Sequence, residues 1–213
     1  MLISDLKKVS FAAIGAGVTA GMADAADTKA VDRLLAGIKD KDDQVRTEAW
    51  LGAGKVGAAA VRPLAKVMTD KELEVARAAK RGLWKIVRHV GRPKAGPERR
   101  AVNAELVGLL GDDQPASVRR EVLWMLSEIG SRECVEAIAA LLSNRQLRED
   151  ARMALQRIRS KKALAALKAA LQAVPEDFKL NIAQSLRQRG VKVVGFACVK
   201  LVPTKKTNVK RLK

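Results

Sequence analysis

Hydrophobic positions recur with a helical period along this chain, and one stretch of sequence returns several times. DDQVRTEAWLGAGKVG at residues 42–57 resembles PASVRREVLWMLSEIG at residues 115–130: both place Val-Arg near the start, Leu in the middle and Gly at the end. Weaker copies surround Arg77 and Arg152, and a degraded last copy ends at Gly190. Apolar residues fall at i, i+3, i+4 and i+7 in each copy, which predicts a series of amphipathic helices.

A second amphipathic stretch precedes each copy, over residues 30–38, 59–68, 99–110, 134–142 and 162–174. The pattern therefore predicts five antiparallel helix pairs. A single pair of this size cannot bury its own apolar stripe, but stacked pairs share a continuous core. We expect an all-α solenoid over residues 26–190. Pro175 suits the opening of the last helix and Asp177 its cap, and left-handed turns are expected at the ends of three copies, at Gly57, Gly130 and Gly190.

These copies resemble HEAT repeats, in particular the short HEAT-like type also found in phycobilisome lyase subunits. The resemblance covers roughly residues 30–190 and implies the solenoid fold. It also implies that the recurrent arginines join a polar ladder between repeats: Arg46, Arg77, Arg119 and Arg152. It does not choose a function, because similar repeats occur in scaffolds, lyase subunits and nucleic-acid enzymes.

The first 25 residues follow the order of a secretory signal peptide. Lys7 and Lys8 precede an uncharged run from Val9 to Ala23, and Ala23 and Ala25 are the small residues of a cleavage site after Ala25. We therefore expect an exported, periplasmic or secreted protein without a membrane span in the mature chain. The alternative is a first helix that caps the fold of a cytoplasmic protein.

Charge adds a prediction about partners. The chain has 41 Lys and Arg against 23 Asp and Glu, a formal net charge of +18, which favours anionic partners such as acidic proteins, nucleic acid, acidic glycans or lipid surfaces. On a helical projection of EVARAAKRGLWKIVRHVGRPK, Trp84 lies at the edge of a basic stripe opposite the apolar face. The predicted stripe consists of Arg77, Lys80, Arg81, Lys85, Arg88 and Arg92. Trp50, Trp84 and Trp124 are interpreted as core or rim residues.

The helical period is lost after residue 190, where a basic tail begins. Two roles are compatible with it. Val193, Val194, Phe196, Val199 and Leu201 could cover the last repeat as an extended cap, while the end of the chain could bind a polyanion through Lys205, Lys206, Lys210 and Arg211.

Residues for catalysis are hard to find. The only histidine, His89, cannot form a His-based metal site, no nucleophile motif is recognisable, and GAGKVG lacks the spacing of a phosphate-binding loop. Cys134 and Cys198 are interpreted as two small thiols, which could pair in an exported protein. The sequence thus favours a non-enzymatic scaffold without cofactor or metal that binds a protein or another anionic partner. The alternatives are a nucleic-acid-binding protein, similar to the glycosylases built of such repeats, and a lyase or chaperone-like subunit.

Overall fold

The computed structural model describes residues 25–198, which form ten α-helices and contain no strand. The predicted all-α class is therefore confirmed. The helices are α1 (Ala25–Ile38), α2 (Asp43–Gly52), α3 (Val61–Val67), α4 (Leu73–Val90), α5 (Gly96–Gly108), α6 (Ala116–Ile129), α7 (Val135–Ala140), α8 (Arg148–Arg157), α9 (Lys161–Ala173) and α10 (Glu176–Gln188). Short 3₁₀ turns extend the pairs at Ala53–Lys55, Gly57–Ala60, Arg132–Cys134 and Leu141–Ser143.

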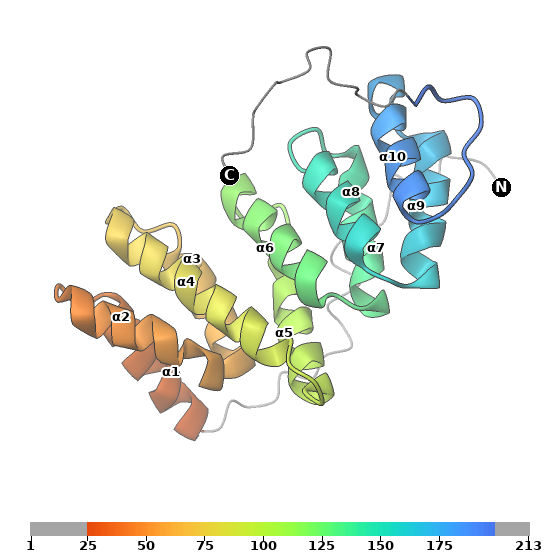
Figure 1. Ribbon diagram of the computed structural model, residues 1–213. Helices are drawn as coiled ribbons and strands as arrows, with labels where there is room; N and C mark the ends of the chain where they lie inside the picture. The colour runs from red at the N-terminus through yellow and green to blue at the C-terminus, as the bar shows by residue number, and fades with distance from the viewer. Residues whose placement is uncertain (1–24, 199–213) are drawn as a thin grey trace, which may run out of the picture.

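Helix pairs stack side by side into a solenoid (Figure 1). The second helices of the pairs form one row, in which α2 contacts α4, α4 contacts α6, α6 contacts α8 and α8 contacts α10. The first helices lie against them in a second layer, with α1 next to α3, α3 next to α5, and α7 next to α9. The α1–α2 pair lies at one end of the molecule and the α9–α10 pair at the other (Figure 1).

One hydrophobic core runs through all the pairs, from Val31 in α1 to Leu186 in α10. Leu64, Leu83, Leu106 and Leu123 are completely or almost completely buried and come from four successive helices. Burying one such side chain contributes about 1.5–3 kcal/mol, and each is buried against neighbours from another helix. This dependence on neighbouring helices is why the amphipathic pattern must repeat along the chain.

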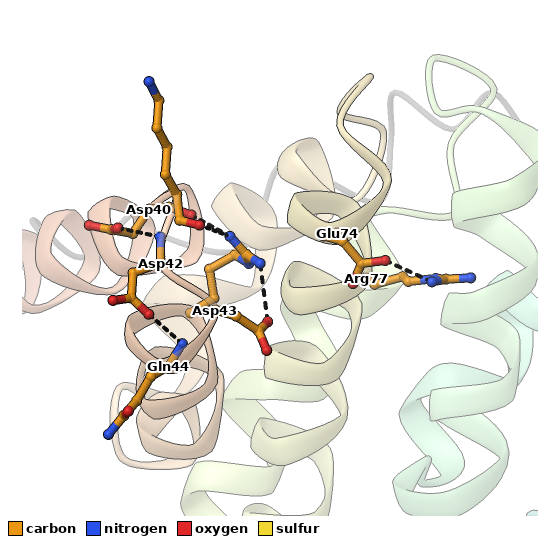
Figure 2. A network of polar contacts seen from close by, with 8 residues as sticks. Asp40, Asp42, Asp43, Gln44, Glu74 and Arg77 are labelled. Atoms are coloured by element: carbon orange, nitrogen blue, oxygen red, sulfur yellow. Dashed lines mark hydrogen bonds and ion pairs between the residues drawn. The ribbon is translucent and has the colours of Figure 1, made fainter.

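The start of α2 shows how the recurrent arginine organises a repeat. Asp42 is the N-cap and accepts a hydrogen bond from the backbone N–H of Gln44 at 2.7 Å (Figure 2). Arg46 donates to the backbone carbonyls of Asp40 and Lys41, both at 2.8 Å, and pairs with Asp43. Its guanidinium therefore fixes the turn that leads into the helix.

Two details of the predicted helix ends are wrong. Asp177 does not cap α10, because the N-cap position belongs to Pro175 and the Asp177 carboxylate accepts from Arg148 of α8 instead. Gly57 and Gly190 do adopt left-handed conformations, with φ of 73° and 78°, but Gly130 has φ of −59° and ψ of 147°. Gly130 is required for space: a Cβ atom there would stand 2.3 Å from the carbonyl oxygen of Leu126.

After α10 the chain turns back over the last repeat. Val193 and Phe196 pack against the core, and Arg187 donates to the carbonyl of Phe196 at 2.6 Å. Two residues of the predicted cap therefore contact the core, whereas Val194 is 78% exposed. Val199, Leu201 and the predicted signal segment before α1 lie outside the described residues.

Candidate functional site

The predicted basic stripe is built by α4, whose two faces differ sharply. Ala79, Leu83, Ile86 and Val87 are buried on one side, whereas the Lys and Arg residues of the other side are exposed or, for Lys85, half-buried. An amphipathic helix with bulky apolar residues at i, i+3, i+4 and i+7 can only lie with its charged face outward. Arg92 is the exception among the candidates, because α4 ends at Val90 and Arg92 lies in the following turn.

Three of the candidate cations are neutralised by carboxylates. Arg77 pairs with Glu74 of the same helix at 2.8 Å (Figure 2). Lys80 pairs with Glu121 of α6 at 2.6 Å. Arg92 makes a bidentate contact to Glu98 of α5 at 2.7 and 2.8 Å. These three residues have their counter-charges within the protein, and they contribute less to any external anion site.

Arg81, Lys85 and Arg88 have a different environment. Within residues 25–198 none of them forms an ion pair, and each lies over an indole ring. Arg81 and Lys85 lie 5.6 and 5.4 Å from the centroid of Trp50 on α2, and Arg88 lies 5.7 Å from the centroid of Trp84. An exposed cation–π contact of this kind contributes only about 0.5–1 kcal/mol, so the cationic groups keep most of their capacity for an anion.

Between the later repeats, each tryptophan and a neighbouring cation bind a carboxylate. Lys80 and the indole N–H of Trp84 both reach Glu121, at 2.6 Å each. One repeat further, Arg120 and the indole N–H of Trp124 both reach Asp150 of α8, at 3.2 and 3.1 Å. In both cases a cation, a tryptophan four residues later and a carboxylate from the second helix of the next repeat thus form a closed ladder.

The ladder is open between α2 and α4. Trp50 has a cation four residues before it, Arg46, but that side chain is directed to the turn before α2. Across from Trp50, α4 offers Arg81 and Lys85 in place of a carboxylate. Two like charges over one ring repel each other by a few tenths of a kcal/mol, and a bound anion would relieve that repulsion. We call Trp50, Arg81, Lys85 and Arg88 the open ladder site.

Sequence reasoning missed the part that Trp50 plays in this surface. Trp50 was interpreted as a core or rim residue, and the ring does pack against the core with Trp84, while Trp124 is 40% exposed. The pairing of Trp50 with Arg81 and Lys85 joins positions 31 and 35 residues apart in neighbouring repeats. Aligning the repeats would not have revealed this difference, because Glu121 lies two residues after the recurrent Arg119 whereas Asp150 lies two residues before Arg152.

The recurrent arginines are mostly structural, as the family resemblance implies. Arg46, Arg119 and Arg152 have side chains that are 14%, 7% and 15% exposed, and each bonds to groups of the protein. Arg152 bridges two repeats, because it binds Glu149 in its own helix and the hydroxyl of Ser185 in α10. Arg77 departs from this pattern, since its side chain is 56% exposed and, among residues 25–198, pairs only with Glu74 of its own helix.

Other candidate groups offer little chemistry. His89 lies near the end of α4 with its side chain 37% exposed, 3.9 Å from Glu98. Cys134 is buried, burial raises the pKa of its thiol, and it is not bonded to the exposed Cys198. Residues 25–198 contain no cluster of His, Cys, Asp or Glu suited to a metal ion. The tail candidates Lys205, Lys206, Lys210 and Arg211 lie outside the described residues.

Part of the chain is similar to a known family of repeats. The stacked helix pairs define an α-solenoid repeat protein. Residues 103–187, from α5 to α10, match the family model described as HEAT repeats. With the same helix pair continuing through α1 to α4, the chain is a HEAT-like repeat protein.

Further comparisons add little about function. A solved structure described as an engineered protein is 22% identical, with a TM-score of 0.42, over 76% of this chain and 78% of its own. No curated protein matches the sequence. None of the helices within residues 25–198 is long and apolar enough to cross a membrane.

Proposed function

We propose that this protein is a non-catalytic scaffold that binds an acidic protein partner at the open ladder site. HEAT repeats form helical scaffolds that typically mediate protein interactions, and the groups suited to an anion lie on the row of second helices. The observation that carries the proposal is that Arg81 and Lys85 share the indole ring of Trp50, where no carboxylate from residues 25–198 binds the ring as Glu121 and Asp150 do in the later repeats. An aspartate or glutamate of the partner would complete the ladder there, as Glu121 and Asp150 do between the later repeats.

Two features favour a protein over a nucleic acid as the partner. Cations lie over the rings of both Trp50 and Trp84, so a base would have to displace them before it could stack. The same two helices also expose apolar side chains, with Val45 39%, Leu51 49% and Leu73 60% exposed. Protein interfaces combine buried apolar groups with a charged rim, whereas contacts to the nucleic-acid backbone are almost entirely polar.

Charge reversal at the site tests the proposal. We expect Arg81→Glu/Lys85→Glu to weaken binding of a fluorescent poly-glutamate peptide by about tenfold or more in anisotropy titrations, because about 1.4 kcal/mol corresponds to a factor of ten. The control is Lys168→Glu/Lys192→Glu, which makes the same change in net charge at exposed positions in α9 and after α10. Equal losses in the two variants would mean that only net charge matters and would refute the site.

A parallel titration with single-stranded DNA separates the partner classes. The proposal expects the peptide to bind more tightly than DNA of matched charge. Tighter binding of DNA, with a salt slope that falls by about 2 in Arg81→Glu/Lys85→Glu, would instead support the nucleic-acid function.

A further inference from the structure

A polar groove lies at the opposite end of the solenoid, where α8 ends and α9 begins. Its volume is about 790 Å³, and the ends of α6 and α10 form its sides through Glu128 and Arg189. A second hollow of about 500 Å³ adjoins it, shares Ser160 and Lys161 with it, and reaches Arg132. We call these two adjoining hollows together the α8–α9 groove.

Most cations of the α8–α9 groove have partners in the protein. Arg157 pairs with Glu128 at 2.7 Å, Arg132 with Glu133 at 3.0 Å, and Lys162 with Glu136 at 3.3 Å. Arg159 and Lys161 are exposed and, within residues 25–198, form no ion pair. These two side chains flank Ser160 at the point where the two hollows meet.

Arg189 removes the acceptors that would otherwise counter this positive charge. Its guanidinium donates to the carbonyls of Leu155 at 2.9 Å, Ile158 at 2.8 Å and Ser160 at 3.1 Å. Carbonyls at the end of a helix carry the negative pole of its dipole, and a guanidinium placed on them neutralises that pole. Within residues 25–198, Arg159 and Lys161 therefore have no counter-charge, and the nearby helix-end carbonyls are already bound to Arg189.

The composition of the lining indicates the chemistry of the ligand. Neither hollow has an aromatic side chain in its lining, and Leu164 is the one large apolar residue there. A nucleotide base or an apolar anchor would find no surface to pack against. Guanidinium and ammonium groups distributed over two adjoining hollows instead suit carboxylates spaced along an extended chain.

We propose that the α8–α9 groove is a second binding site for an extended acidic peptide segment, held by Arg159 and Lys161. This proposal rests on the proposed function only for the acidic chemistry of the partner, because the residues of the groove belong to other repeats than those of the open ladder site. Helices α8 and α9, which line the groove, lie in later repeats of the solenoid than α2 and α4, which carry the open ladder site (Figure 1). A partner with two acidic segments could therefore bind both sites at once and gain affinity from the second contact.

Charge reversal in the full chain tests the groove. We expect Arg159→Glu/Lys161→Glu to weaken binding of the poly-glutamate peptide several-fold, while Lys39→Glu/Lys41→Glu, the same charge change at exposed positions of the α1–α2 end, has a smaller effect. A circular dichroism melt of each variant confirms that it is folded. Equal losses in both variants would overturn the groove assignment.

A footprint at single lysines keeps this test separate from that of the open ladder site. Saturating peptide is expected to slow the acetylation of Lys161 and leave that of Lys39 unchanged, as followed by mass spectrometry. Protection of Lys85 without protection of Lys161 would overturn the groove and leave the proposed function standing; the reverse pattern would overturn the proposed function and leave the groove. Single-stranded DNA that protects Lys161 better than the peptide would contradict the peptide assignment.

Discussion

At the scale of single residues, Arg119 illustrates an arginine that belongs to the fold. Its side chain is 7% exposed and pairs with Asp112 at 2.8 Å, while its Nε and Nη2 atoms have no hydrogen-bond partner within the described residues. A buried cation with one partner recovers only part of its desolvation cost, so an apolar side chain of similar length can replace it without loss. Removal of the partner leaves the charge uncompensated.

We therefore expect Arg119→Met to unfold at the same urea concentration as the wild type or a higher one. Asp112→Ala should lower the free energy of unfolding by about 1 kcal/mol, a small value for a lost partner because Asp112 is 83% exposed. Urea unfolding of the two variants measures both effects. A larger loss in Arg119→Met than in Asp112→Ala would show that the buried guanidinium stabilises the fold.

At the scale of helices, the contact between α1 and α2 depends on a missing side chain. A Cβ atom at Gly37 would stand 2.7 Å from the Cβ of Ala49, closer than two such atoms can approach. Gly37→Ala should therefore push the two helices apart and lower the free energy of unfolding by about 1–3 kcal/mol. Gly52 is the last residue of α2 and has a right-handed helical conformation. A Cβ atom added there would have no neighbouring atom within 4 Å.

Gly52→Ala is the matched control, and it should be neutral or stabilise the protein by up to about 1 kcal/mol through helix propensity. Thermal unfolding of both variants gives the comparison. Similar melting temperatures for Gly37→Ala and the wild type would mean that the two helices can separate at little cost.

At the scale of the whole molecule, stability should vary along the solenoid, and acid should open its C-terminal end first. Hydrogen bonding from Arg148 lowers the pKa of Asp177. Burial raises the pKa of Glu149, but hydrogen bonds from Arg152 and Asn181 outweigh this effect, so the pKa of Glu149 is lowered as well. Both carboxylates join α8 to α10. A carboxylate whose pKa is lower in the folded than in the unfolded state stabilises the fold at pH values above its unfolded-state pKa of about 4. This stabilisation is lost as the pH falls below that value and the carboxylate becomes protonated.

Hydrogen exchange followed by mass spectrometry tests this order of opening. Below about pH 4, α10 amides should lose protection before those of α4 and α6, after correction for the intrinsic exchange rate, because α10 lies at one end of the stack and packs mainly against α8 and α9. Glu149→Gln/Asp177→Asn should be less protected already at neutral pH and show less change on acidification. Loss of protection at the same pH in every helix would contradict the expectation.

The outcome of the sequence predictions depends on how local each feature is. The five helix pairs and the two faces of α4 follow from apolar residues three and four positions apart, and these predictions are confirmed. The helix ends were less predictable, because they depend on contacts from elsewhere: Asp177 is occupied by Arg148, and Gly130 is needed for the space beside the Leu126 carbonyl and Ile158.

The sequence by itself determined the repeat, the α-helical class and the concentration of positive charge, since these depend on composition and on spacing within one helix. Only the tertiary structure decided which cations on the basic face of α4 lack a counter-charge within the described residues. Glu121 reaches Lys80 from the next repeat, whereas Arg81 and Lys85 meet the ring of Trp50 from the previous one. Electrostatic pairing acts over a few ångströms in space, and stacking of the repeats brings together residues that are more than 30 positions apart in the chain.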